Sequence, residues 1–252
     1  MIPVDGGEVW AEDTGGDRPP LLLLHPGVGD SRIWDPLMPE LTQTHRVIRY
    51  DTRGYGRSPA AAVAFSLLDD CVAVLDRLAV GRTPIVGCSQ GGGTALSLAF
   101  AQPERVSAIV LLCPGIPGFE WPEEPELDRE REAAFQEGQQ AMVDLGLRLW
   151  GAAGPTPEIV EQMRSAVAAW LSSSHLQRED PPILDRLGEI SVPTSLMIGD
   201  LDMPALVESD LLAASRIPGC ELIEVAGLDH FPPLRVPDLV LKQIADTLAR
   251  AR

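Results

Sequence analysis

The sequence contains no apolar run of the roughly 18 to 20 residues that a membrane-spanning helix needs, and we expect no such span. Positive charge is also scarce, since 20 Lys and Arg residues face 37 Asp and Glu residues, for a formal net charge of −17. A phosphate backbone requires clustered Lys and Arg, so we expect no nucleic-acid partner. The N-terminal residues lack both the basic and the apolar region of a signal peptide, and we expect a cytoplasmic protein.

Cysteines are few and show no pattern. The four of them have none of the paired spacings that zinc or redox sites use: Cys71, Cys88, Cys113 and Cys220. We expect four reduced thiols, most of them buried, and no metal or organic cofactor. The 252 residues contain no internal repeat and no low-complexity segment, so they suit one large α/β domain or such a domain with an insertion.

Apolar runs with β-strand character alternate with segments of helical periodicity. The six runs are residues 21–26, 46–51, 83–89, 106–114, 194–200 and 220–227. Continuous apolar strands are typical of a parallel sheet that is buried on both faces. Segments such as 68–78 and 241–248 repeat apolar residues at helical spacing, which predicts helices that cover the sheet. Near the N-terminus, Asp5-Gly6-Gly7 between two short alternating runs predicts a hairpin and an antiparallel edge.

The alternation stops in the middle of the chain. Residues 115–188 contain no strand-like run, which predicts an inserted helical cap between two parts of a core domain, 1–114 and 189–252. The best helix of this insertion begins at Pro155-Thr156-Pro157-Glu158, where proline falls in the first turn. Its apolar stripe runs from Ile159 to Trp170 and is expected to cover the mouth of the core domain.

The pentapeptide Gly87-Cys88-Ser89-Gln90-Gly91 lies between an apolar strand and a helical run. A short G-x-S-x-G motif is weak evidence by itself, because it recurs by chance. Its position adds evidence, because a strand before it, a helix after it and small residues around it are what a nucleophile elbow needs. We therefore predict that Ser89 is a nucleophile at the N-terminus of a helix, where the helix dipole points at the site. The alternative is an ordinary glycine-rich turn.

A serine hydroxyl needs a base within reach and a carboxylate that orients the base. Of the four histidines, only His230 follows a plausible acid, and it stands in the loop directly after the last apolar run. Two candidates for the acid follow the preceding run. We prefer Asp202 to Asp200, because it lies further into the loop, and we expect Asp200 to bind backbone in the turn. Asp229, next to the histidine, is expected to have a structural role.

Acyl transfer builds negative charge on the carbonyl oxygen of the substrate, and two backbone N–H groups typically stabilise it. We expect one of these oxyanion-hole donors to be Gln90. The other is expected in the loop that follows the first long apolar run. Pro26 has no N–H, so Gly27 is the better candidate and Val28 is the alternative. His25 is expected to brace this loop.

Five segments resemble those of the α/β-hydrolase superfamily in the same order: HPGVGDSRIWDPL (25–37), YDTRGYGRS (50–58), GCSQGG (87–92), GDLD (199–202) and GLDHFPP (227–233). The resemblance implies a mostly parallel eight-stranded sheet with helices on both faces. It carries the roles of nucleophile, acid and base onto Ser89, Asp202 and His230, and so supports Asp202 over Asp200. Many members have glycine where this chain has Pro26. Haloalkane dehalogenases and epoxide hydrolases of this fold hold aspartate at the elbow, so the serine disfavours both activities.

Within the serine branch the chain resembles small cofactor-free hydrolases such as enol-lactonases, carboxylesterases and non-haem haloperoxidases. We expect it to hydrolyse a small carboxylic ester, lactone or thioester that is uncharged or weakly polar. The same triad could instead hydrolyse a C–C bond or form a peracid for haloperoxidation, and a non-catalytic ligand-binding relative is a third reading.

The substrate pocket is expected to involve five residues: Val28, Trp121, Trp150, Met203 and Phe231. The aromatic residues of the insertion, Trp121, Trp150, Trp170 and Phe135, have a second interpretation, since aromatic residues at helical spacing often pack helices together.

Overall fold

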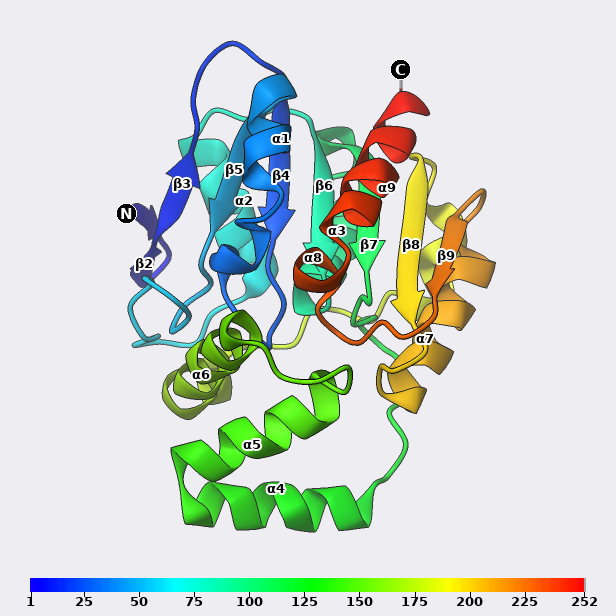
Figure 1. Ribbon diagram of the computed structural model, residues 1–252. Helices are drawn as coiled ribbons and strands as arrows, with labels where there is room; N and C mark the ends of the chain where they lie inside the picture. Colours follow the sequence, from blue (N-terminus) through cyan, green and yellow to red (C-terminus); the bar gives the residue numbers. More distant parts are fainter. Residues whose placement is uncertain (252) are drawn as a thin grey trace.

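The computed structural model describes residues 1–251, and its centre is a twisted β-sheet with helices on both faces (Figure 1). The strands of this sheet are β3 (Ala11–Asp13), β4 (Pro20–Leu24), β5 (Arg46–Tyr50), β6 (Thr83–Cys88), β7 (Val106–Leu112), β8 (Thr194–Gly199) and β9 (Glu221–Val225). They lie in the order β3-β5-β4-β6-β7-β8-β9, and each neighbouring pair is parallel except β3 with β5. The predicted fold class is confirmed, and the six predicted strands are β4 to β9.

The number of strands differs from the expected eight. β1 (Ile2–Val4) and β2 (Gly7–Val9) pair with each other as a separate two-stranded sheet, so the main sheet of residues 1–251 has seven strands. The predicted hairpin is present, and Gly6 has the positive φ of 68° that its tight turn requires. Ile2 and Val9 bury their side chains in the core against the main sheet. Packing, rather than strand pairing, therefore attaches the hairpin to the sheet.

Side chains of the central strands alternate between two apolar cores, one on each face of the sheet. Along β4, Leu22 and Leu24 pack into one core, whereas Leu21 and Leu23 pack into the other. The first core is covered by α2 (Leu67–Arg77), α3 (Gln90–Ala101) and α7 (Pro204–Arg216). The second is covered by α1 (Met38–Thr44), α8 (Pro232–Arg235) and α9 (Pro237–Ala249). Short 3₁₀ helices lie at Ser31–Trp34, Pro103–Arg105, Ser174–Leu176 and Leu184–Glu189.

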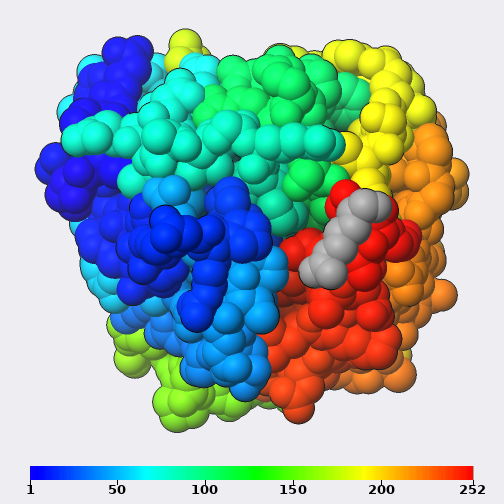
Figure 2. Space-filling view, turned by 90° about the horizontal axis from the view of Figure 1, so that it is seen from above, coloured from blue at the N-terminus to red at the C-terminus, as the bar shows by residue number. Residues whose placement is uncertain are grey.

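The chain between β7 and β8 forms α4 (Pro125–Glu137), α5 (Gln139–Trp150) and α6 (Pro157–Ser172), which lie beyond the carboxyl ends of the parallel strands (Figure 1). The opposite end of the molecule is covered partly by N-terminal segments and by α9 (Figure 2). Helix α6 begins where predicted, because Thr156 Oγ1 accepts a hydrogen bond from Ile159 N at 3.4 Å. Its buried stripe packs into the second core beside Val28 and Tyr55. No helix in residues 1–251 combines the length and the apolar character needed to cross a bilayer.

A buried ion pair ties the N-terminal hairpin to the main domain. Arg53 and Asp70 have side chains only 3% exposed, and their closest atoms, Nη2 and Oδ1, lie 2.7 Å apart. The same guanidinium donates to the carbonyl of Asp5 in the hairpin turn, at 2.7 Å, and stacks over the ring of Phe65. Because Asp70 lies on α2, this one arginine links the hairpin turn to a helix of the core domain.

Replacement of Arg53 by Met should therefore destabilise the protein strongly, because it leaves the Asp70 carboxylate buried without its partner. We expect the free energy of unfolding, measured by urea denaturation, to fall by about 3–5 kcal/mol. The matched control is Arg178→Met, because Arg178 pairs with Asp69 at 3.4 Å and both side chains are more than half exposed. That control should cost no more than about 1 kcal/mol. Equal losses in the two variants would contradict the structural role of the buried pair.

Candidate active site

The strand order brings two functional loops together. The chain passes from β4 to β5 on one side and then returns to β6 on the other, so β4 lies between them. Ligands of open parallel sheets bind outside the carboxyl ends of the strands at such a reversal point. Leu24 of β4 pairs in register with Gly87 of β6, so the loop that begins at His25 and the turn that contains Ser89 leave the sheet side by side. The loop after β4 and the turn after β6 therefore meet at the edge of the sheet where ligands of such folds bind.

Ser89 occupies a strained turn between β6 and α3. Its φ of 49° and ψ of −116° lie in a region that non-glycine residues rarely adopt, at a cost of about 1–3 kcal/mol. The backbone N–H of Ser89 donates to Leu112 O at 2.9 Å. Its carbonyl accepts from the N–H groups of Gly92, Gly93 and Gly115. These hydrogen bonds hold the strained conformation, as the predicted elbow requires.

Glycines allow helix α3 to approach the sheet closely enough to form this turn. A Cβ atom on Gly87 would lie 2.4 Å from the carbonyl oxygen of Gly91, and one on Gly91 would lie 2.3 Å from that of Leu24. Both distances are far inside van der Waals contact and involve backbone atoms that cannot rotate away. A side chain at either position would therefore push α3 off the sheet and displace Ser89.

Asp202 and His230 form a buried hydrogen-bonded pair. Nδ1 of His230 lies 2.6 Å from Oδ2 of Asp202, and the two side chains are 0% and 2% exposed. The other carboxylate oxygen accepts from Met203 N at 2.8 Å. Because a carboxylate only accepts, Nδ1 is the donor, and Nε2 is the acceptor of the neutral ring. Nε2 is buried and has no hydrogen-bond partner within residues 1–251, so it is the nitrogen available to a substrate or nucleophile.

The other two aspartates near this pair have different partners. Asp200 is exposed, and its Oδ1 accepts from Gly227 N at 2.6 Å, as expected for a residue that binds backbone in the turn. Asp229 is fully buried and forms an ion pair with Arg235, with Oδ2 and Nη2 2.6 Å apart, while also accepting from Ala153 N. Both carboxylates thus have structural hydrogen bonds away from the imidazole.

Two buried groups beside Asp202 were not predicted from the sequence. Cys113 follows β7 with a φ of 45°, and its thiol lies within hydrogen-bonding reach of the Asp202 carboxylate. Burial, reinforced by the charge of Asp202, raises the pKa of Cys113 well above its ordinary value, so the thiol stays protonated and can donate. Asp210 of α7 is 1% exposed, and neither of its carboxyl oxygens has a hydrogen-bond partner in the described chain. No local motif marks either residue, because both act through contacts between distant segments.

The donor atoms of Cys113, Asp202 and His230 lie within 4.8 Å of one another, so a metal site has to be considered. Ligand atoms of a tetrahedral zinc ion at 2.0–2.3 Å stand about 3.4 Å apart. The 2.6 Å between His230 Nδ1 and Asp202 Oδ2 is too short for an ion between them. The arrangement fits a hydrogen-bonded pair, not a metal centre. All four cysteines are free thiols, and only Cys220 is not fully buried.

The two residues expected to supply the oxyanion hole lie next to each other. A Cβ atom on Gly27 would stand 3.1 Å from Gln90 Oε1, so Gly27 and Gln90 are in direct proximity. The N–H of Gln90 is the first of helix α3 and has no acceptor within the helix. His25 braces the loop as expected, because its Nε2 accepts from Thr52 N at 3.0 Å and its Nδ1 lies 2.8 Å from Pro26 O.

Two cavities flank these groups. The larger, about 490 Å³, lies among α4, α5 and α6 and has mostly apolar walls. They comprise Asp128, Arg131, Glu132, Ala134, Phe135, Met142, Leu145, Gly146, Leu149, Trp150 and Trp170. The smaller, about 350 Å³, is more polar and is lined on one side by Gln90, Gly115 and Trp121. Trp150 reaches the histidine, since its ring centroid lies 4.5 Å from that of His230.

The five residues expected in the pocket have different surroundings. Trp150 lines the larger cavity and Trp121 the smaller one, where it contacts the edge of Phe119 and is 50% exposed. Val28 and Phe231 are buried in the second apolar core, and with half-buried Met203 they line neither cavity. Of the other aromatic residues of the insertion, Trp170 and Phe135 line the larger cavity.

Comparison with known proteins identifies relatives over most of the chain. Residues 19–154 match the model of the alpha/beta hydrolase fold family. The structure of Est816, described as an N-acyl homoserine lactone degrading enzyme, is similar with a TM-score of 0.81 and 30% identity over 97% of this chain and 98% of that one. The pimeloyl-[acyl-carrier protein] methyl ester esterase of Nitrosomonas europaea is 26% identical over 90% of this chain and 94% of that protein.

A higher local identity is confined to part of the chain. The 2-hydroxymuconate semialdehyde hydrolase of Pseudomonas sp. (strain CF600) is 40% identical over 116 residues, which are 43% of this chain. The match spans 40% of the length of that relative.

The unpartnered carboxyl of Asp210 should make the stability of the protein depend on pH. Burial, reinforced by the charge of Asp202, raises the pKa of Asp210 well above 3.8 in the folded protein. When the pH is above the ordinary pKa of aspartate, this carboxyl loses its proton in the unfolded chain but keeps it in the folded protein. The free energy of unfolding therefore falls as the pH rises towards the raised pKa. Asp210→Asn removes this titrating group, so we expect the variant to gain stability relative to wild type as the pH rises from about 4 towards the raised pKa.

Urea denaturation at several pH values measures the effect. The matched control is Glu208→Gln, which removes a carboxyl group from an exposed position on the same helix and should show a nearly constant difference in stability from wild type. A difference between Asp210→Asn and wild type that does not change with pH would show that Asp210 keeps an ordinary titration.

Proposed function

The chain belongs to the α/β-hydrolase fold family, and from this premise we propose that it is a serine hydrolase that cleaves a carboxylic ester, lactone or thioester. The observation that carries the proposal is the buried Asp202–His230 hydrogen bond, which leaves Nε2 as the one unpartnered nitrogen of the ring. The strained turn at Ser89, which follows the carboxyl end of β6, supports it further. Relatives described as a methyl ester esterase and as a lactone-degrading enzyme support an ester-type bond.

In the proposed first half-reaction, Ser89 Oγ attacks the carbonyl carbon of the substrate while its proton passes to Nε2 of His230. The electron pair of the carbonyl moves onto oxygen, and the N–H groups of Gly27 and Gln90 stabilise that charge, each by about 3–4 kcal/mol. Asp202 stays ionised and stabilises the imidazolium that forms. Collapse of the tetrahedral intermediate breaks the bond to the alcohol or thiol, which takes the proton from His230 and leaves an acyl-enzyme.

In the second half-reaction a water molecule replaces the alcohol. His230 takes a proton from the water as its oxygen attacks the acyl carbon, and the proton then passes to Ser89 Oγ when the acyl bond breaks. The products are a carboxylic acid and the free enzyme. The residues required are the triad and two backbone N–H groups, so the proposal calls for no metal and no organic cofactor.

We further propose that residues 115–188 act as a cap over a core domain of residues 1–114 and 189–252. The apolar cavity of about 490 Å³ among α4, α5 and α6 supports this division, because Trp150 in its wall touches His230. A cavity of this size and character suits a small, partly apolar substrate. The acidic surface, with a net charge of −17, favours an uncharged substrate over an anionic one.

The proposal predicts that Ser89→Ala abolishes hydrolysis of short p-nitrophenyl esters while the fold is unchanged. Alanine keeps the Cβ atom of the turn and removes only the attacking oxygen. Release of p-nitrophenol measures the activity, and circular dichroism with thermal melting checks the fold. Undiminished turnover in a folded Ser89→Ala protein would rule out the acyl-enzyme mechanism.

The two aspartates after β8 allow a matched test of which one acts as the acid that orients His230. Asp202→Asn should lower kcat by about 10⁴-fold, because an amide in place of the carboxylate no longer holds Nδ1 as the donor or stabilises the imidazolium. Asp200→Asn should leave kcat within a few-fold of wild type, because its amide oxygen can still accept from Gly227 N. Initial rates with a p-nitrophenyl ester decide between the positions, and a larger loss in Asp200→Asn would reverse the assignment.

A further inference from the structure

The carbonyl of Gly27 receives hydrogen bonds from two side chains of different elements. Trp170 of α6 donates its indole N–H at 2.9 Å, and Tyr55, from the loop after β5, donates its hydroxyl at 3.1 Å. Gly27 is one of the two proposed oxyanion-hole residues. A helix 143 residues further along the chain thus binds the loop that would stabilise the transition state.

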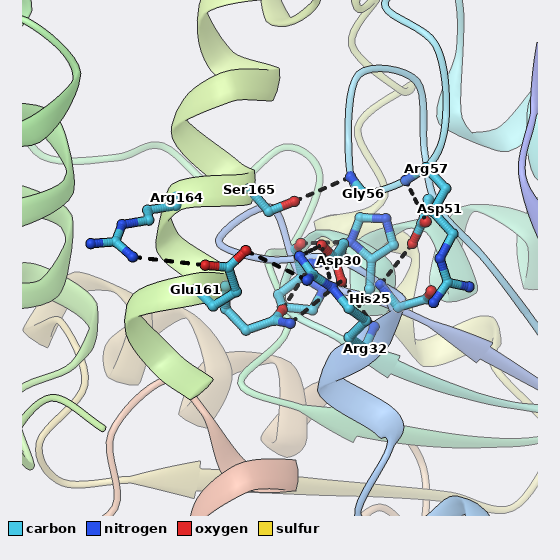
Figure 3. Close-up of polar contacts among 12 residues, drawn as sticks. His25, Asp30, Arg32, Asp51, Gly56, Arg57, Glu161, Arg164 and Ser165 are labelled. Carbon is cyan, nitrogen blue, oxygen red and sulfur yellow. Dashed lines mark hydrogen bonds and ion pairs between the residues drawn. The ribbon is translucent and has the colours of Figure 1, made fainter. Parts of the chain in front are cut away.

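The same helix holds the far end of this loop. Gln162 is 4% exposed, and its Oε1 accepts from Asp30 N at 2.8 Å. A Cβ atom on Gly29 would lie 2.0 Å from that oxygen, so only glycine admits the contact. Ser165 accepts from Gly56 N at 3.1 Å and lies beside Asp30 (Figure 3). Helix α6 therefore contacts the loop from Gly27 to Asp30 at both ends.

The loop needs such external contacts, because Gly27 and Gly29 lack the Cβ atom that restricts the backbone of other residues. On the N-terminal side of Gly27, the Pro26 carbonyl is held by Gly29 N at 3.3 Å and by His25 Nδ1. On its C-terminal side, its own carbonyl is held by Trp170 and Tyr55. The N–H of Gly27 belongs to the Pro26–Gly27 peptide, whose plane the first pair of contacts fixes, and the contacts from Trp170 and Tyr55 fix the next peptide. Gly27 is therefore held from both sides before substrate binds. Preorganised donors are what make oxyanion stabilisation effective.

Trp170 also lines the larger cavity, together with Trp150. One tryptophan of this cavity is thus bonded to the oxyanion loop, and the other packs against His230. A group that fills the cavity would contact both the ring that positions Gly27 and the ring that packs on the base.

We propose that Trp170 is a positioning residue for the oxyanion hole: through the Gly27 carbonyl its indole N–H fixes the Gly27–Val28 peptide. This limits rotation about the backbone bonds of Gly27 and so keeps the Gly27 N–H directed at the substrate oxygen. The inference rests on the proposed function, since it assigns a role within the same site. It differs from a role in packing alone, because it depends on one hydrogen atom of the indole and not on the volume of the ring. The expected effect is on the transition state more than on the bound substrate.

The test uses Trp170→Phe, which keeps an aromatic ring in the cavity and removes the N–H donor. With a p-nitrophenyl ester we expect kcat to fall about tenfold, less than the 10²–10³ lost when a donor is deleted outright, and KM to change less than twofold. The matched control is Phe135→Leu in the same cavity. Phe135 lies on α4, which supplies none of the hydrogen bonds to the loop described above, so this variant should affect KM only.

Inhibition by a trifluoromethyl ketone distinguishes a role in positioning from a role in packing, because this inhibitor forms a tetrahedral oxyanion with the serine. Its inhibition constant should rise in Trp170→Phe by the same factor as kcat falls, while that of the corresponding methyl ketone stays constant. A change in KM alone, or equally weaker inhibition by both ketones, would show that Trp170 only lines the pocket and would overturn the inference.

A second variant keeps the test decisive even where Trp170→Phe fails to fold. Benzothienylalanine at position 170 has nearly the shape of tryptophan with sulfur in place of N–H, and it should show the same selective loss. Wild-type kinetics in this variant would overturn the inference while leaving the proposed hydrolase function intact. Absence of ester hydrolysis in the wild-type protein would instead refute the proposed function itself.

Discussion

The close approach of helix α3 to the sheet is the constraint on which the rest of the site depends. Ser89 stands where it does because Gly87 and Gly91 let the first turn of α3 come within backbone contact of β4 and β6. The same approach places Gln90 beside Gly27 and puts three backbone donors onto the Ser89 carbonyl. The strain of the turn is thus balanced by hydrogen bonds that only this arrangement offers. Without those glycines, the strand-to-helix turn and the neighbouring loop would separate.

A second feature is the burial of the polar groups that the site uses. The carboxylate of Asp202 is surrounded by donors from His230, Met203 and the thiol of Cys113, with no Lys or Arg among them. In such apolar surroundings a hydrogen bond is stronger than in water, and an unpaired polar group is costly. Nε2 of His230 is left unpartnered in residues 1–251, and that is the atom on which the proposed chemistry depends. Helix α6 extends the same principle to the oxyanion loop through Trp170 and Gln162.

Local patterns in the sequence were enough to predict the six strands β4 to β9, the strand-to-helix turn at Ser89 and the start of α6, because each depends on neighbouring residues. The backbone role of Asp200 was predictable for the same reason. The fold class was predicted from the alternation of these segments along the chain and from the resemblance of five motifs. Contacts between distant segments were not: the Trp170–Gly27 bond and the positions of Cys113 and Asp210 beside Asp202 require the folded chain. Phe231, one of the residues expected in the pocket, packs in the second apolar core and lines neither of the two cavities, and its local sequence does not reveal this packing.

The most direct test of whether Ser89 and His230 act together is the site and rate of covalent modification by a fluorophosphonate, followed by mass spectrometry of the intact protein and of its peptides. We expect a single adduct, located on Ser89, that forms rapidly in the wild-type protein and much more slowly in His230→Ala, because Nε2 no longer accepts the serine proton. An adduct on another residue, no adduct at high excess of the probe, or equal rates in the two proteins would contradict the claim that Ser89 and His230 act together.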